Sequence, residues 1–163
     1  MVTIKGVSDY GGFFILDPSF SDFDSMYDSI EGKGNDETLC ERTPAGVMLL
    51  TSDKVNSIEI NFEVLLEKPS INKFEEWSKV VESSLELTSD TLVFCTLPDG
   101  VEYPFGTIFI NPASYVLRIY YRDELYGQKD EDIDNEDTED RVEQFRIQAW
   151  CGSLVETTVL YSK

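Results

Sequence analysis

Histidine is absent from this sequence, and its absence removes a large share of enzyme chemistry. Histidine changes charge near neutral pH, so it is the commonest general base and the commonest ligand of transition metals. Catalytic triads that need histidine and zinc sites with histidine ligands are therefore excluded. The sequence also lacks the glycine-rich GxGxxG and P-loop motifs that bind phosphates.

Cysteine is scarce as well. The three cysteines, Cys40, Cys95 and Cys151, are an odd number and lie far apart, which matches neither a CxxC pair nor a disulfide framework. No histidine could activate any of them as a nucleophile. Cys95 lies within an apolar strand pattern, so we expect it to be a buried small hydrophobic residue. Free thiols in a reducing compartment are the expectation.

Long apolar runs are missing too. The first residues, MVTIKGVSDYGG, do not combine a basic region with an apolar run as a signal peptide does. No stretch approaches the length needed to span a membrane. Together with the free thiols, this predicts a cytoplasmic protein.

Basic residues are few, at 13 against 32 acidic ones, and the formal net charge is −19. Such a chain repels phosphate backbones and anionic lipid surfaces, so direct binding to nucleic acid or to membranes is disfavoured. It should attract basic proteins or cations, and salt should weaken that attraction. We expect a basic protein as the partner.

Most of the negative charge lies in two segments. Residues 123–143 hold eleven acids against Lys129 and Arg141, and residues 17–41 hold eight acids against Lys33. The two segments carry −9 and −7, so only −3 is left for the rest of the chain. Solubility alone would not require this concentration, and it indicates two presented anionic surfaces.

A calcium loop is one alternative for the second segment. Counting from Asp132, the first, third, fifth and twelfth positions are Asp132, Asp134, Glu136 and Glu143, which matches the ligand positions of an EF-hand. Asp137 stands where the EF-hand needs glycine, and the flanking patterns are those of strands. We therefore expect a solvated anionic loop and no metal site.

Acidic residues also alternate with apolar ones on two predicted strands. Glycoside hydrolysis needs a pair of carboxylates with one raised pKa in a cleft. The candidates here are Glu59, Glu63, Glu82 and Glu86. Alternation is typical of the solvent side of a strand, so we expect these acids to face water. The sequence thus predicts a non-enzymatic protein with no catalytic residues, metal or cofactor.

The fold expected for the 163 residues is a single all-β domain, 1–163. Aromatic residues make up 12% of the chain, which suits half-buried strands. Patterns of strand type cover residues 2–7, 13–16, 46–52, 56–66, 81–87, 91–97, 103–110, 115–122, 143–150 and 155–161. Many short strands at this spacing favour a sandwich or barrel. We expect a mainly antiparallel β-sandwich.

Two hairpins and one or two short helices complete the expected fold. Residues 81–87 and 91–97 form one predicted hairpin, and the strands that flank the second acidic segment form the other. Phe20, Phe23, Met26, Tyr27 and Ile30 recur at helical spacing, which permits a short helix over residues 21–30 or a packed loop. A second helix is expected after Asn72, because Glu75 follows it at capping-box spacing, and this helix would turn Phe74 and Trp77 inward.

Several residues between positions 55 and 150 form a recognisable pattern. Trp77 precedes Val80-Val81-Glu82, and Pro112 precedes a strand with Tyr115 and Arg118; the motif Gln148-x-Trp150 follows later. This pattern resembles a broad bacterial family of small, largely uncharacterised β-sandwich proteins. The last elements are also similar to nuclease inhibitors of the competence-protein-J type. The broad β-sandwich family usually has a glycine before the strand with the tyrosine. Ala113 and Ser114 stand there in this sequence, which affects the expected turn geometry.

The resemblance implies a fold and a class of function, but it assigns no functional residues. Relatives of this kind are often encoded beside toxin genes, which implies an immunity or inhibitor protein. With the charge distribution, it predicts that the chain neutralises a basic partner such as a toxin nuclease domain. The alternative is a regulatory or ligand-binding module whose acidic loops only solubilise it.

The residues expected to bind the partner come from the two acidic segments. They are ten acids and one tyrosine, an anchor candidate: Asp22, Asp24, Asp28, Tyr126, Asp130, Asp132, Asp134, Glu136, Asp137, Glu139 and Asp140. Phe20, Phe23 and Tyr27 are further anchor candidates, unless they belong to the core. One partner can use both segments only if they meet at one end of the sandwich.

Overall fold

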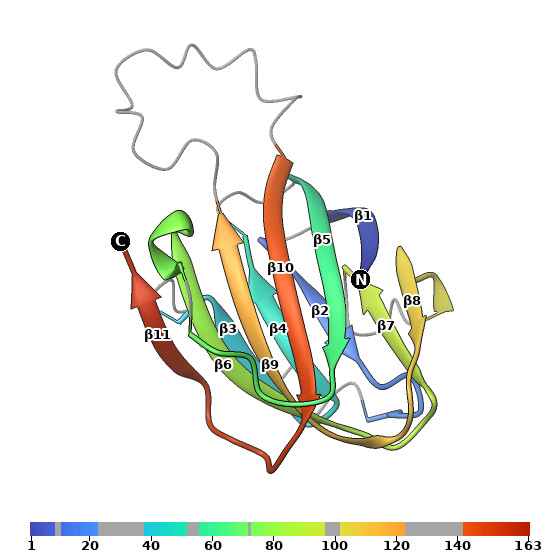
Figure 1. Ribbon diagram of the computed structural model, residues 1–163. Coiled ribbons are helices and arrows are strands. Elements are labelled where there is room, and N and C mark those ends of the chain that lie inside the picture. Colours follow the sequence, from blue (N-terminus) through green and yellow to red (C-terminus); the bar gives the residue numbers. More distant parts are fainter. Residues whose placement is uncertain (9–10, 23–37, 52–55, 72, 97–101, 123–141) are drawn as a thin grey trace.

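The computed structural model describes residues 1–8, 11–22, 38–51, 56–71, 73–96, 102–122 and 142–163 (Figure 1). These residues form two β-sheets packed face to face. The six-stranded sheet runs in the order β1 (Val2–Ser8), β5 (Asn56–Leu65), β10 (Val142–Cys151), β9 (Ala113–Arg122), β6 (Lys79–Leu87) and β11 (Thr158–Ser162). The five-stranded sheet runs in the order β3 (Cys40–Thr43), β4 (Gly46–Leu50), β2 (Gly12–Leu16), β7 (Thr91–Cys95) and β8 (Gly106–Phe109).

The core lies between the sheets because alternate residues of each strand are apolar. In β5, Ile58, Ile60 and Phe62 are buried, and the residues between them face outward. Phe13 of β2 packs edge-to-face on Phe145 of β10 with ring centroids 5.1 Å apart, which joins the two layers. The predicted fold class, a mainly antiparallel all-β sandwich, is therefore confirmed.

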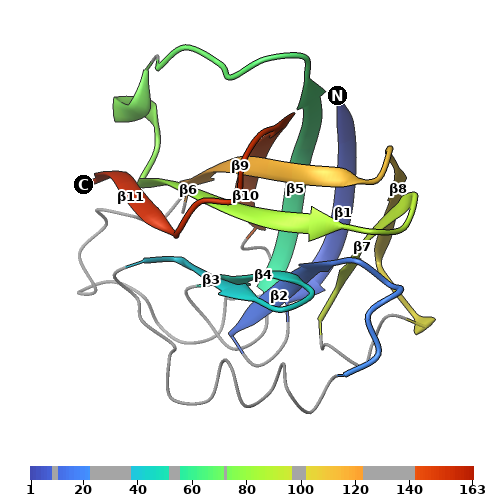
Figure 2. The same ribbon diagram turned by 90° about the horizontal axis from the view of Figure 1, so that it is seen from below.

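One connection departs from simple antiparallel order. β5 pairs with β10 in parallel, whereas every other strand pair in the two sheets is antiparallel. After β5 the chain does not enter a neighbouring strand. It crosses the outer face of the six-stranded sheet to reach β6, through residues 66–71 and 73–78, which we term the crossover segment (Figure 2). This face is thus partly covered on the side away from the core.

The ten predicted strands all exist, with ends shifted by a few residues. The predicted hairpin between β9 and β10 is confirmed by their antiparallel pairing. The predicted hairpin of residues 81–87 with 91–97 is wrong, because β6 belongs to the six-stranded sheet and β7 to the five-stranded one. Strand β3 was not predicted, since four residues are too few to show a period.

The helix predicted after Asn72 is reduced to one turn. Phe74–Glu76 form a 3-10 helix (η1), and Lys73 is its N-cap in a left-handed conformation (φ 55°) without a side-chain capping bond. Asn72, the expected cap, lies outside the described residues, as do positions 23–30 of the other predicted helix. Phe74 and Trp77 do not point into the core. They pack on Tyr120 across the outer face of the six-stranded sheet.

The two ends of the sandwich differ. At the end that we term the tight end, short connections join β3 to β4, β6 to β7 and β8 to β9. At the opposite end, the loop end, Ser8 of β1 pairs with Asn56 of β5, and Arg122 of β9 pairs with Gln144 of β10. The N-terminal start of β10 lies beside the start of β5, because Val142 pairs with Ser57.

Candidate partner-binding surface

The second acidic segment attaches to the loop end at both of its points, whereas the first leaves from the tight end, where Asp17 follows β2, and returns at the loop end. The second segment leaves from the end of β9 and returns at the start of β10, and both points lie at this end (Figure 1). The first segment returns to the described residues at Thr38, next to β3, whose first residue Cys40 pairs with Leu49 of β4. Leu50, which follows Leu49, ends β4 opposite Gly12 at the start of β2. The two segments therefore share the loop end only at the point where the first one returns.

The described residues hold little of the net charge. They contain 14 acidic and nine basic residues, a net of −5, so −14 of the total −19 falls on residues that the structure does not describe. Several described acids also have a basic partner: Lys5 with Glu59, Lys73 with Glu76, Arg118 with Glu82 and Arg146 with Glu63. The sandwich is a nearly neutral body that carries its excess negative charge elsewhere.

One predicted partner-binding residue falls within the described part, Asp22, and it is exposed. The other ten lie outside the described residues: Asp24, Asp28, Tyr126, Asp130, Asp132, Asp134, Glu136, Asp137, Glu139 and Asp140. Of the three further anchor candidates, Phe20 packs against the cluster of Phe14 and Leu16 outside the main core. Phe20 is thus a packing residue, and Phe23 and Tyr27 are outside the described residues.

Asp17 was counted with the first acidic segment, but it has a structural role. Its carboxylate is buried at the tight end and accepts six hydrogen bonds from the backbone N–H and hydroxyl groups of Ser19, Thr88 and Ser89, at 2.6–3.2 Å. Its own N–H donates to the Ala45 carbonyl at 3.0 Å. Burial alone would raise the pKa of the Asp17 carboxyl, but the hydrogen bonds from Thr88 and Ser19 outweigh it and hold the pKa well below its ordinary value.

The contacts of Asp17 lie at the point where the chain passes from β6 in one sheet to β7 in the other. Asp17 follows β2 of the five-stranded sheet, and it binds Thr88 and Ser89 directly after β6. The carboxylate therefore ties the end of one sheet to the point at which the chain leaves the other. Sequence reasoning missed this role, because its three binding partners include two residues about seventy positions away.

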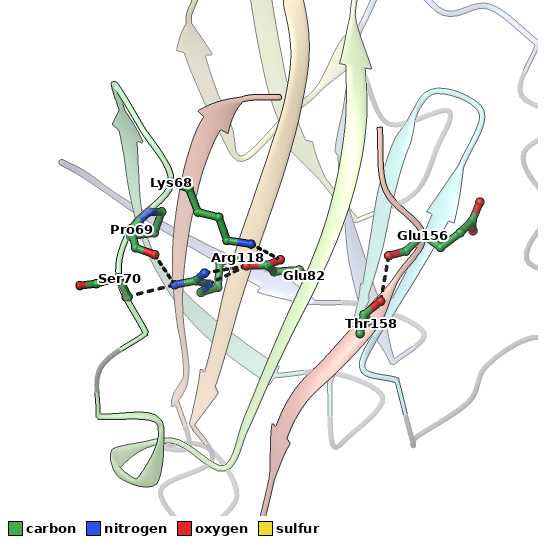
Figure 3. A network of polar contacts seen from close by, with 7 residues as sticks. All are labelled: Lys68, Pro69, Ser70, Glu82, Arg118, Glu156 and Thr158. Atoms are coloured by element: carbon green, nitrogen blue, oxygen red, sulfur yellow. Dashed lines mark hydrogen bonds and ion pairs between the residues drawn. The ribbon is translucent and has the colours of Figure 1, made fainter. Parts of the chain in front are cut away.

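Glu82 and Arg118 form an ion pair beneath the crossover segment (Figure 3). Arg118 is fully buried, and its Nε and Nη2 donate to Glu82 Oε1 at 2.9 and 2.7 Å. Its Nη1 donates to the carbonyls of Pro69 and Ser70, at 3.0 and 3.2 Å. Lys68 also reaches Glu82, at 3.2 Å. This pair holds the crossover segment against the sheet, so the expectation that Glu82 simply faces water was wrong.

Glu63 is the centre of a second polar group on the same face. Its Oε1 accepts from Arg146 Nη2 and from Gln148 Nε2, both at 2.7 Å. Tyr120 donates to Gln148 Oε1 at 2.8 Å. Burial would raise the pKa of the Glu63 carboxyl, but hydrogen bonds from Arg146 and Gln148 and the charge of Arg146 lower it overall. Glu63 is thus a bound carboxylate, whereas Glu86 is exposed as expected.

Several motif residues of the sequence pattern gather on this outer face, whereas Val81 and Tyr115 belong to the core. Arg118 lies 5.5 Å from the ring centre of Trp150, and Trp77 packs against Tyr120 with ring centroids 5.4 Å apart. Arg122 lies over Trp77 at 4.9 Å and donates to the Glu76 carbonyl. Each contact joins the crossover segment to the sheet or two strands to each other. The pattern therefore marks the architecture of the fold.

The described residues give little support to a metal site. They contain no group of three or more histidine, cysteine or acidic side chains that could hold a metal ion. Glu143, the last ligand position of the supposed calcium loop, is buried within β10, and the other positions lie outside the described part. Among described helices, none is long and apolar enough to cross a membrane.

The three cysteines are free thiols. Cys40 and Cys95 are buried, and Cys151 is exposed. Burial raises the pKa of the Cys40 thiol to about 12, although Ser83 and Thr157 hydrogen-bond to it. The expectation that Cys95 is buried is confirmed.

The fold has counterparts among solved structures. One is ComJ from Bacillus subtilis, described as an inhibitor of the DNA degrading activity of NucA; it is 11% identical, covers 93% of this chain and 96% of its own, and gives a TM-score of 0.56. Another is the product described as crocagin biosynthetic gene J, at 13% identity, 93% and 98% coverage and a TM-score of 0.57. The three proteins share a fold. No protein-family model matches the sequence, and no curated protein does either.

Proposed function

We propose that this protein is a non-enzymatic inhibitor that binds a nuclease with a basic surface and blocks its access to DNA. The observation that carries the proposal is the arrangement of charge: the second acidic segment starts and returns at one end of a sandwich whose body is nearly neutral, and the first segment returns at the same end. The similarity to ComJ, an inhibitor of a DNA-degrading activity, supports the nuclease as the class of partner.

The physical basis is competition for cationic side chains. A nuclease must place lysine and arginine residues against DNA phosphates, and this electrostatic contribution dominates its affinity. A segment with nine net negative charges, residues 123–143, offers carboxylates to the same cations. Long-range attraction would accelerate the encounter of the two proteins, and contacts at the interface would set the lifetime of the complex.

The contributions of the residues follow from their positions in the sequence. The steering cluster is formed by Asp130, Asp132, Asp134, Glu136, Asp137, Glu139 and Asp140. A second patch is formed by Asp22, Asp24 and Asp28, and Tyr126 is the aromatic anchor. In this proposal a basic toxin nuclease of the same cell is the partner, and the chain acts as its immunity protein in the cytoplasm.

A second candidate function has one specific observation in its favour. The product described as crocagin biosynthetic gene J shares the fold to a similar degree, and that description is of a biosynthetic gene. A regulatory or ligand-binding module would use the sandwich body, and its acidic segments would only keep it soluble. Binding of such a module to its target would survive neutralisation of those segments.

The two functions are separated by a binding and inhibition assay. The purified chain is titrated into the nuclease encoded by an adjacent gene, with NucA of Bacillus subtilis as a reference, and DNA degradation is followed at several salt concentrations. We expect stoichiometric inhibition and an association rate that falls steeply as salt rises. Binding that persists without salt dependence after both acidic segments are neutralised would contradict the electrostatic proposal.

A further inference from the structure

A solvent-open cavity of about 300 Å³ lies where the two sheets meet at the tight end. Its walls come from both sheets: Arg42 and Thr43 of β3, Pro44 in the following turn, Glu86 of β6 and Glu156 before β11. Figure 3 shows Glu156 beside the β3–β4 hairpin, on the far side of β6 from the pair of Arg118 and Glu82.

A second hollow, of about 170 Å³, adjoins the first. The two share Pro44 and Glu86, and the second adds Phe20 and Ala45 as apolar walls. Together they form one inter-sheet groove with a charged part and an apolar part. The carboxylate of Asp17 also borders the second hollow, but its hydrogen bonds to Ser19, Thr88 and Ser89 already occupy it.

Three charged residues of this groove, unlike Asp17, are not used by the fold. The guanidinium groups of Arg118, Arg122 and Arg146 each donate to a protein oxygen. Arg42, by contrast, makes no ion pair or side-chain hydrogen bond with any residue in the part of the chain that the structure describes. The carboxylates of Glu86 and Glu156 likewise have no such partner there. One cation and two anions therefore face the same cavity.

We propose that the inter-sheet groove binds a basic α-amino acid, such as arginine or lysine. Such a ligand carries one carboxylate and two cationic groups, which is the charge complement of Arg42, Glu86 and Glu156. A guanidinium can hold a carboxylate through two parallel hydrogen bonds, and this suits Arg42. The methylene chain of the ligand would lie on Pro44 and Phe20. A volume of about 300 Å³ is at the lower end of the range for small-molecule sites.

This inference goes beyond the proposed function, because it concerns the tight end and needs no nuclease. Binding would be measured by isothermal titration calorimetry of the full chain with L-arginine and L-lysine. Two matched probes each lack one group: agmatine has no carboxylate, and L-norleucine has no side-chain cation. We expect at least one of the two basic amino acids to bind at least about 10-fold more tightly than either matched probe.

Substitutions assign the binding to the groove. Arg42→Gln should weaken the binding of L-arginine at least about 10-fold and bring it level with agmatine, since a charge-assisted contact is lost. Glu156→Gln should weaken the binding of L-arginine and of agmatine by the same factor. Glu67→Gln, which removes an exposed acid that does not line the groove, is the matched control and should leave binding unchanged.

Three outcomes would overturn the inference. No heat of binding at millimolar L-arginine or L-lysine would show that the groove holds neither. Equal binding of agmatine and L-arginine to the unmodified protein would mean attraction by net charge. Unchanged affinity in Arg42→Gln would place the ligand elsewhere. The thermal midpoint of each variant is compared with that of the unmodified protein, so that a folding defect is not read as lost binding.

Discussion

Arg118 Nη2 lies 2.7 Å from Glu82 Oε1, and the guanidinium of Arg118 is fully buried although it belongs to the outer face of a sheet. The crossover segment covers this face, and Arg118 binds two of its carbonyls. The pair therefore fixes a long connection that the sheet hydrogen bonds do not hold. This makes the pair a test of how the outer face is stabilised.

Glu82→Leu should destabilise the protein by about 3–5 kcal/mol, because it leaves a buried guanidinium without its anion. The double variant Glu82→Leu/Arg118→Leu should be more stable than Glu82→Leu, since the uncompensated charge is then removed. The measurement is urea unfolding followed by circular dichroism. Glu59→Leu, which breaks the exposed pair with Lys5, is the control and should cost about 0–1 kcal/mol. Equal losses of unfolding free energy in Glu82→Leu and Glu59→Leu would contradict a buried, structural pair of Glu82 and Arg118.

Asp17→Asn should destabilise the tight end by about 2–4 kcal/mol, because an amide cannot accept the hydrogen bonds of Ser19, Thr88 and Ser89 as a carboxylate does. Chemical denaturation at neutral pH measures the loss. Asp22→Asn removes the same charge from an exposed position and serves as the matched control. A similar loss in the control would mean that net charge, not the hydrogen bonds, is responsible.

The pH dependence of Asp17 has a definite sign. Its pKa is lower in the folded protein than in the unfolded chain, where an aspartate titrates near pH 4. The unfolded chain therefore binds a proton first as the pH falls, and the stabilisation by Asp17 is complete above about pH 5 and is lost progressively below it. The unfolding free energy of Asp17→Asn should thus change less between about pH 5 and pH 2 than that of the unmodified protein. If the unfolding free energies of the two proteins changed equally over this pH range, Asp17 would not be the group responsible.

Thiol reactivity should separate the three cysteines. Cys151 is exposed, whereas Cys40 and Cys95 are buried and burial holds the pKa of the Cys40 thiol at about 12. A thiolate is needed for reaction, so one thiol per chain should react with a disulfide reagent at neutral pH, and three should react after denaturation. Cys151→Ser should abolish the fast reaction. A second fast thiol in the folded protein would contradict the burial of Cys40 and Cys95.

Strand positions could be predicted from the sequence because they depend on local periodicity. Ile58, Ile60 and Phe62 alternate with polar residues, and this pattern alone decides which face of β5 is buried. Assigning strands to sheets was harder. The turn at residues 88–90 has the length of a hairpin turn, and the residue that binds it as the chain passes to the other sheet is Asp17, far away in the sequence.

The polar groups of the outer face could not be predicted for a similar reason. Glu82 alternates with apolar residues in the same way whether water or another segment covers it. Its burial depends on the crossover segment and on Arg118, which is 36 positions away. The charge concentration, by contrast, is a property of composition. The end at which both acidic segments return depends on the register of β9 with β10 and of β3 with β4, which the sequence does not reveal.

Neutralising the steering cluster should slow association more than it speeds dissociation. Asp130→Asn, Asp132→Asn and Asp134→Asn together remove three charges from the segment that starts and returns at the loop end. Glu67→Gln, Glu86→Gln and Asp90→Asn remove the same charge from the tight end and form the matched control. Binding kinetics with the nuclease, measured at several salt concentrations, compare the two variants.

Both triple variants remove three negative charges, so a difference in binding kinetics between them reports where on the protein those charges lie. A charge near the interface acts within about one Debye length, roughly 8–10 Å at physiological salt, whereas a charge at the far end of the sandwich is screened. The loop-end variant should therefore lose association rate and part of its salt dependence, and the tight-end variant should keep both. Equal loss in the two variants would mean that only net charge matters. Loss in the tight-end variant alone would place the interface at the inter-sheet groove.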